Sequence, residues 1–276
     1  MHSDTASLEV TRHQLASVCD TMGATLMRSA SSPNIKERLD FSCAVFDIAG
    51  RMLAQAAHIP VHLGALPAAV SAARAAGRWR RGDAVLLNDP YAGGSHLPDL
   101  TLVSPVFDRS GAAGRPVALL VSRAHHADIG RTAGSLPLAD DLFGEGLVLP
   151  PVRLVDGGRQ SRAVWAIVAA NSRTPEARGA DLEAQWAAHR AGERRLDELL
   201  KGIPRLPGPL RRLLGWSRDL ALAGLAALPA SSARFADALD DNGRGSGRCG
   251  FRLPSRSART ASTSTSRHRA RVRRRP

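Results

Sequence analysis

The 276-residue chain has only three cysteines, too few and too scattered for a cysteine-based framework. Cys19, Cys43 and Cys249 are scattered along the chain, which fits neither a zinc ribbon nor a disulfide framework. We interpret Cys19 and Cys43 as buried thiols, because free cysteine is among the residues most often found in protein cores.

Long hydrophobic runs are also absent. The apolar run Leu220–Leu228 has only nine residues, whereas a membrane-spanning helix needs about 20. The N-terminal residues include His2, Asp4 and Glu9 and lack the apolar stretch of a signal peptide. The sequence therefore predicts a soluble cytoplasmic protein that has no membrane partner.

Lysine is scarce, and with it the commonest phosphate-binding motif. Lys36 and Lys201 are the only lysines, and there is no Gly-x-x-x-x-Gly-Lys loop. If ATP is used, we do not expect this chain to bind it through such a loop. The net charge of +13 would suggest nucleic acid as a partner. Residues 244–276, however, contain eleven arginines and no acidic residue, and subtracting these eleven leaves about +2 for residues 1–243. Nucleic acid is therefore not the expected partner.

The arginine-rich end, residues 244–276, is otherwise composed mainly of Ser, Thr, Ala and Pro. Such a composition offers little apolar surface to offset the entropy of ordering, so it predicts a disordered tail. Two other interpretations stay open: a basic arm for acidic surfaces, or the product of a reading-frame shift that ends a truncated protein.

The pattern of apolar residues predicts an α+β fold with a mixed or antiparallel sheet. Helical spacing indicates helices near 5–29, 65–77, 164–171, 176–200 and 210–228. Strands are indicated by a hairpin at 37–55 and by the runs 84–87, 100–106, 117–121 and 152–155, with a further strand at 234–239. We divide the chain into a sheet domain with the site (1–160), a helical segment that begins a truncated second half (161–243), and the tail (244–276).

Side chains that can bind metals or move protons gather where the central strands end. Asp89, His96 and Asp99 lie in the loop between 84–87 and 100–106, and Arg123, His125, His126 and Asp128 follow the run 117–121. Loops that leave buried strands present side chains from a rigid base. Gly93 and Gly94 permit close approach of the backbone, and Pro98 stiffens the segment between His96 and Asp99.

This set predicts a mixed nitrogen and oxygen metal site. The candidate ligands are His96, Asp99, His125 and Asp128, and the candidate catalytic residues are Asp40, Asp89, Arg123 and His126. Imidazole with carboxylate suits Zn²⁺, Mn²⁺ or Fe²⁺. Adjacent histidines on an extended chain point in opposite directions, so at most one of His125 and His126 is expected to face the ion. The simpler interpretation of each histidine, a hydrogen-bonded loop residue, stays open.

Other candidates are weaker. His58 and His62 flank Pro60 and could belong either to the wall of the site or to an ordinary loop. Polar residues of the helical half could also reach the site, although capping of helix ends explains them equally well; they are Asn171, Arg173, Asp181 and Gln185.

Five stretches in order resemble the hydantoinase B/oxoprolinase family. They are ERLDFSCAVFDIAGRMLAQAAHIPVHLGALP (37–67), GDAVLLNDPYAGGSHLPDLTLVSPVF (82–107), SRAHHADIG (122–130) followed by GSLP (134–137), EGLVLPPVRL (145–154) and NSRTPEARGADLEAQ (171–185). The family includes B-type subunits of N-methylhydantoinase, the C-terminal half of 5-oxoprolinase and relatives in acetone carboxylase. The resemblance covers about residues 8–243, which correspond to the N-terminal half of a family member.

The resemblance implies a reaction and a partner. An A-type hydantoinase subunit with an actin-like ATP site would phosphorylate a small cyclic amide, and the B-type chain would complete a metal-assisted ring opening. Matched by motif, the reaction set would be Asp40, His96, Asp99, His125, His126 and Asp128. The main hypothesis is thus a B-type subunit of an ATP-dependent cyclic-amide hydrolase. The alternatives are a carboxylase subunit of the acetone carboxylase type, a truncated non-catalytic remnant, and a nucleic-acid-binding protein that uses the arginine-rich tail.

Overall fold

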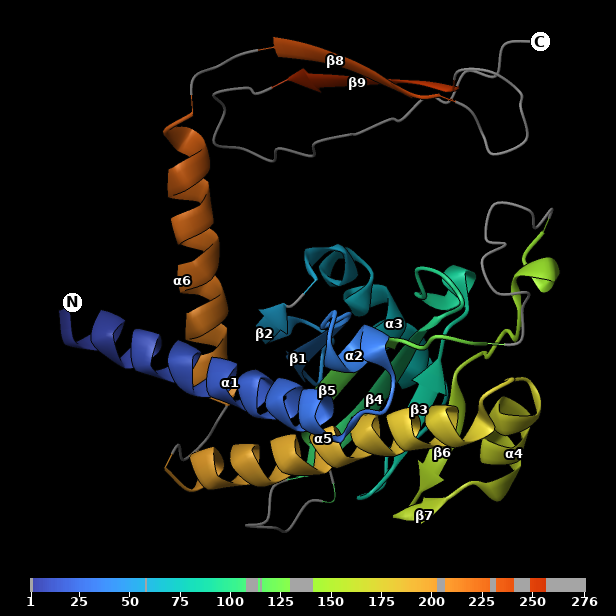
Figure 1. Ribbon diagram of the computed structural model, residues 1–276. Helices are drawn as coiled ribbons and strands as arrows, with labels where there is room; N and C mark the ends of the chain where they lie inside the picture. Colours follow the sequence, from blue (N-terminus) through green and yellow to red (C-terminus); the bar gives the residue numbers. More distant parts are fainter. Residues whose placement is uncertain are drawn as a thin grey trace. The chain divides into compact units, whose positions relative to one another are not determined.

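A computed structural model describes residues 2–57, 59–107, 114, 116–129, 141–202, 207–228, 232–240 and 249–256. The chain divides into two compact units (Figure 1). The first comprises residues 1–133 and 141–213, and the second comprises residues 134–140 and 214–276. All the predicted site residues fall in the first unit.

The chain begins with a long helix and a hairpin, as the sequence predicts. Helix α1 (His2–Ser29) is followed by the short helix α2 (Pro33–Lys36) and by strands β1 (Phe41–Asp47) and β2 (Met52–Ala57). The turn between the strands is fixed by Asp47, whose carboxylate accepts hydrogen bonds from the backbone and side chain of Arg51 at 2.8 and 2.7 Å. The 3-10 helix η1 (Pro60–Gly64) and helix α3 (Leu66–Ala75) come next.

A seven-stranded antiparallel sheet forms the centre of the first unit. Its further strands are β3 (Ala84–Leu87), β4 (Asp99–Phe107), β5 (Pro116–His125), β6 (Val152–Asp156) and β7 (Arg159–Gln160), and their order is β2-β1-β5-β4-β3-β6-β7. Strand β5 pairs with β1 on one side and with β4 on the other, so β1 lies next to a strand that is distant from it in sequence. The predicted α+β fold and its antiparallel sheet are confirmed.

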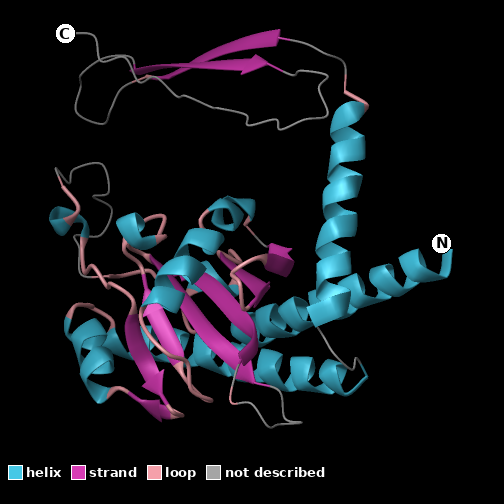
Figure 2. Cartoon of the chain, turned by 180° about the vertical axis from the view of Figure 1, so that it is seen from behind, coloured by secondary structure: helices cyan, strands magenta, loops and turns pink. Residues whose placement is uncertain are grey.

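Both faces of the sheet are covered. One face packs against α3 through a core cluster that includes Phe46, Leu87 and Val121. The other carries α4 (Arg162–Ala170) and α5 (Pro175–Gly202) over a cluster that includes Leu86, Leu102 and Leu182. Helices α1 and α5 lie side by side (Figure 1), and Figure 2 shows the strands from behind. Because strands buried on both faces need apolar residues at every position, they appear in the sequence as continuous runs.

Helix α5 places a row of polar side chains against the sheet and α1. The carboxylate of Asp181 is fully buried and accepts hydrogen bonds from the backbone N–H groups of Ser31 and Ser32 at 2.7 and 3.0 Å. It also forms an ion pair with Arg178 at 2.9 Å. These contacts hold the end of α1 against α5.

A buried imidazole on α5 makes the stability of the fold sensitive to acid. His189 lies between Ser104 on β4 and Ser122 on β5, whose hydroxyls hydrogen-bond Nδ1 and Nε2 at 2.6 and 2.9 Å. Burial lowers the pKa of His189 from 6.5 to about 3. The folded state therefore holds the imidazole neutral, and the stability that depends on it is complete above pH 6.5.

We expect His189 to lower the free energy of unfolding as the pH falls from about 6.5 towards 3. The decrease should be about 1.4 kcal/mol for each pH unit. The unfolded chain takes up this proton in that window and the folded chain does not. Urea unfolding at about pH 7 and about pH 5 measures the loss, and the variant His189→Gln, which cannot titrate, should lose less. An equal pH dependence in both proteins would show that other groups cause the loss.

The second unit contains most of α6 (Pro207–Ala226) and a hairpin of β8 (Ser232–Leu239) and β9 (Cys249–Arg256). Strand β9 differs from the prediction of a disordered tail from residue 244. Apolar Phe251 and Leu253 alternate with Gly250 and Arg252 in a pattern typical of a strand, which the arginine content of the whole segment obscures. The rest of the tail, 244–248 and 257–276, lies outside the described residues. Among the described helices, none is long and apolar enough to cross a membrane.

Candidate metal centre

The strand register brings three of the predicted residues together. Asp99 is the first residue of β4 and pairs with His125, the last residue of β5. Asp40 immediately precedes β1, and its carbonyl accepts a hydrogen bond from the backbone N–H of His125 at 2.9 Å. These residues are therefore neighbours across three strands, where side chains directly opposite each other are about 5 Å apart.

His96 completes a group of three possible metal ligands. Its Nε2 atom lies 2.7 Å from Oδ1 of Asp99 and 3.2 Å from Nδ1 of His125, and this Nδ1 is 3.2 Å from the same Oδ1. These three residues form the group, among those the structure describes, that could hold a metal ion. The Asp99 side chain is buried, at 4% exposure, whereas that of His96 is 37% exposed and opens the group to solvent.

The separations of these atoms match those within a coordination shell. Nitrogen and oxygen ligands bind zinc at about 2.0–2.2 Å, so two tetrahedral ligands lie about 3.3 Å apart. The observed separations of 2.7–3.2 Å are close to this value. Two imidazoles and one carboxylate, with one side open, also resemble the donor set of a catalytic rather than a structural site. The residues therefore fit a divalent ion.

A second layer of polar groups surrounds the three candidate ligands. Nε2 of His62, on η1, lies 3.5 Å from Oδ2 of Asp99 and 3.6 Å from Oδ1 of Asp40. Its Nδ1 lies 3.1 Å from the hydroxyl of Ser42. The sequence left the role of His62 undecided, and the structure places it at the centre. His58 lies outside the described residues.

The ionisable groups of the centre have shifted pKa values. Burial opposes ionisation of Asp99, but hydrogen bonds from His125, His96 and Ser95 outweigh it and hold the pKa of this carboxyl well below its usual range. The hydrogen bond to Asp99 raises the pKa of His96, while burial lowers the pKa of His62. A carboxylate that stays ionised next to imidazoles suits the binding of a cation.

Arg123 holds the loop that carries His96. Its buried guanidinium donates to the carbonyl of Gly93 at 2.7 Å, to the hydroxyl of Thr101 at 2.8 Å and to that of Ser95 at 3.4 Å. Ser95 in turn donates to Oδ2 of Asp99 at 2.5 Å. Arg123 therefore fixes the geometry of the loop, and Ser95 links it to the candidate ligand Asp99.

Two glycines let this loop pack tightly, as the sequence predicts. Gly93 has φ +93°, and a Cβ atom there would lie 2.2 Å from the backbone nitrogen of Ala69. At Gly94 a Cβ atom would lie 2.1 Å from the carbonyl oxygen of Asn88. Only glycine permits this approach of backbone to backbone.

Three predicted residues make their contacts away from the candidate ligands and the polar groups around them. Asp128, a predicted ligand, forms an ion pair with Arg173 at 2.9 Å and accepts from the hydroxyl of Ser172. His126 is fully buried, with Nε2 2.9 Å from Oε1 of Gln185 on α5, which agrees with the prediction that only one of the two adjacent histidines faces the centre. Asp89 caps the 3-10 helix η2 (Pro90–Ala92) by accepting from the backbone N–H of Tyr91.

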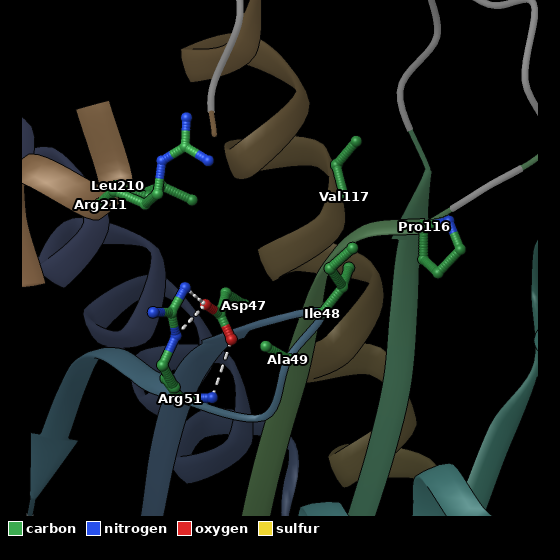
Figure 3. Close-up of a pocket in the computed structure, with 8 residues that line it drawn as sticks. All are labelled: Asp47, Ile48, Ala49, Arg51, Pro116, Val117, Leu210 and Arg211. Carbon is green, nitrogen blue, oxygen red and sulfur yellow. Dashed lines mark hydrogen bonds and ion pairs between the residues drawn. The ribbon is translucent and has the colours of Figure 1, made fainter. Parts of the chain in front are cut away.

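A separate pocket of about 200 Å³ lies at the opposite end of the strands (Figure 3). It is formed by the β1–β2 turn, the start of β5 and the first part of α6, through Asp47, Ile48, Ala49, Arg51, Pro116, Val117, Leu210 and Arg211. Asp47 ends β1, whereas Asp40 precedes it. The seven residues of β1 separate the two places by about 20 Å, so this pocket is not part of the metal centre.

Comparison with known proteins identifies relatives of this chain among amide hydrolases. The profile described as hydantoinase B/oxoprolinase matches residues 4–268. The 5-oxoprolinase of Dictyostelium discoideum is 40% identical over 202 aligned residues, in a match that covers 71% of this chain and 16% of that protein. A protein of Pseudomonas sp. named as the B-type chain of a D-/L-hydantoinase is 32% identical over 237 aligned residues, in a match that covers 82% of this chain and 39% of that protein.

A solved structure is also similar. The crystal structure of an ATP-dependent caprolactamase from Pseudomonas jessenii superposes with a TM-score of 0.79 at 30% identity. The match covers 92% of this chain and 44% of the caprolactamase chain. The chain thus spans less than half the length of each of these three proteins.

Proposed function

Since the chain belongs to the hydantoinase B/oxoprolinase family, we propose that His96, Asp99 and His125 hold a divalent metal at a site of ATP-dependent cyclic-amide hydrolysis. The observation that carries the proposal is the convergence of these three side chains, from two strand ends and one loop, with ligand atoms 2.7–3.2 Å apart. The names of the relatives, 5-oxoprolinase, hydantoinase and caprolactamase, support a cyclic amide as the substrate class.

The proposed metal is Zn²⁺, Mn²⁺ or Fe²⁺, because imidazole with carboxylate suits these ions. When bound, it would polarise the amide carbonyl and acidify a water molecule. The side chain of Asp40, 26% exposed, lies with Oδ2 3.8 Å from Nδ1 of His125. We assign to Asp40 the role of accepting the proton from the attacking water.

The surrounding residues would keep the reacting groups in register. His62 lies within 3.6 Å of both Asp99 and Asp40, so it links the proposed ligand and the proposed base. Arg123 and Ser95 fix the loop of His96. Such positioning contributes strongly to rate, because a reacting group misplaced by about 1 Å can cost about 100-fold.

ATP would reach the reaction through a partner. The sequence has no Gly-x-x-x-x-Gly-Lys loop, and one relative is named as the B-type chain of a hydantoinase. We propose an A-type hydantoinase subunit as the partner that phosphorylates the amide. A first water would then attack the activated carbonyl carbon at the centre of this chain, and the ring C–N bond would break as the nitrogen takes a proton. A second water would hydrolyse the resulting acyl phosphate to inorganic phosphate and the ring-opened acid.

The test is reconstitution with an A-type subunit. The complex should release phosphate from ATP only when a cyclic amide such as 5-oxoproline, a hydantoin or a caprolactam is present, and should form the ring-opened acid in equal amount. Removal of metal with a chelator should stop ring opening, and adding back one of the three ions should restore it. Carboxylation of a ketone instead would favour the acetone carboxylase alternative, and no turnover of either kind would favour the non-catalytic one.

A further inference from the structure

The end of α6 is apolar on every side and yet exposed. Residues 220–228 are all Leu, Ala or Gly, and every residue from 217 to 228 is exposed. The leucines at 220, 222, 225 and 228 are 51–59% exposed. At about 100° per residue these leucines span about 200° of the helix circumference. A helix that is apolar all round is normally buried inside a protein.

The hairpin that follows is also incomplete. Among the described residues, β8 and β9 pair only with each other, so both outer edges of this sheet are open. Phe235 and Leu239 on β8 are 61% and 56% exposed. Isolated two-stranded hairpins are marginally stable, and open strand edges are templates for a further strand. As far as the described residues go, two kinds of structure in the second unit therefore lack the layer that would cover them.

The shape of the exposed surface discriminates between possible occupants. A second copy that packs its own α6 against this one covers a single stripe of each helix, and leucines spread over about 200° leave most of the surface bare. A bilayer requires about 20 apolar residues, whereas this run has nine. An occupant that surrounds the helix and also extends the hairpin must be a folded polypeptide of substantial size.

The relatives contain such a polypeptide. This chain covers 39% of the Pseudomonas sp. hydantoinase chain and 44% of the caprolactamase chain, so more than half of each relative has no counterpart in residues 1–276. We propose that residues 217–228 and the hairpin β8–β9 form the docking surface for this additional region of the B-type chain, whether it is joined to residues 1–276 or supplied separately. The surface shares no residue with the metal centre, and the proposal does not depend on the reaction.

The test measures amide hydrogen exchange in residues 217–256 by mass spectrometry. Sedimentation analysis measures the oligomeric state alongside it. The probe is a polypeptide comprising the part of the Pseudomonas sp. hydantoinase chain that lies outside its match to this chain. We expect the chain alone to be monomeric, with fast exchange in 217–228. Adding the probe should slow exchange there and in β8 and β9 by at least about tenfold, as expected for segments that pass from exposed to packed.

Variants of equal exposure make the test specific. The double substitution Leu222→Asp and Leu225→Asp should abolish the protection and the complex, whereas Val10→Asp, on α1 and 56% exposed in the wild type, should change neither. Protection of 217–228 in the chain alone, by dimerisation or by its own residues, would overturn the proposal. Failure of the probe to protect this segment would overturn it as well.

Discussion

The variants His96→Ala and Asp99→Asn are expected to lose the bound metal and to lower ATP-dependent ring opening by about 1000-fold, since a metal supplies several kcal/mol of transition-state stabilisation. His96→Ala removes one of three ligand atoms that lie within 3.2 Å of one another, and Asp99→Asn replaces the carboxylate among them with a neutral amide. Metal content of the purified protein, by mass spectrometry, and product formation with the A-type subunit present measure the two effects.

A histidine of the same chain provides the matched control. His13 lies on α1 with a side chain 69% exposed, so His13→Ala should keep full metal content and activity. His62→Ala separates binding from positioning, because His62 contacts Asp99 and Asp40 but lies outside the group of three. It should retain the metal and lose activity. Full turnover by metal-free His96→Ala would refute the metal-assisted mechanism.

Much of the fold can be derived from local pattern. The runs at 84–87, 100–106 and 117–121 predict buried strands because branched apolar residues fill both faces, and each lies inside an observed strand. The helices can also be predicted from the local sequence. Pro33 and Pro175 stand in the first turns of α2 and α5, where proline is favoured, and the 3.6-residue spacing predicts α1 and α5 to within a few residues.

The site depends on register, which is not a local property. Nothing in the spacing of the sequence places residue 40 beside residue 125, or 125 beside 99. That arrangement follows from β5 pairing with both β1 and β4 in the middle of the sheet. A pairing shifted by one residue would turn His125 to the other face. The density of His and Asp in the sequence could therefore indicate a candidate site but not which residues come together in it.

Asp128 and His62 illustrate two ways in which spacing in the sequence differs from proximity in the structure. Asp128 stands three residues after His125, a spacing that resembles His96 and Asp99, yet β5 ends at His125 and Asp128 pairs with Arg173 instead. His62 has no acidic neighbour in sequence, but η1 brings its ring to Asp99 and Asp40. Spacing in the sequence therefore includes Asp128, whose contacts lie elsewhere, and gives no signal for His62, which lies beside Asp99 and Asp40.

The substitution Gly94→Ala is expected to displace the loop that carries His96 and to lower ring opening by about 100-fold, the cost of a misplacement of about 1 Å. The added Cβ would lie 2.1 Å from the carbonyl oxygen of Asn88. Asn88 cannot move easily, because its side chain is hydrogen-bonded to the backbone of Leu97, Leu147 and Leu149 at 2.7–2.9 Å. The loop of residue 94 must move instead.

Gly179→Ala provides the contrast within the same chain. Gly179 lies in α5, and no atom stands within 4 Å of a Cβ added there. Alanine favours a helix over glycine by about 1 kcal/mol, so this variant should be at least as stable as the wild type. Thermal unfolding and metal titration of both variants test the difference. Gly94→Ala should unfold at lower temperature and bind the metal more weakly, because overpacking costs about 1–3 kcal/mol and moves His96 relative to Asp99. If Gly94→Ala instead binds metal as the wild type does, the close packing of this loop is not what positions His96.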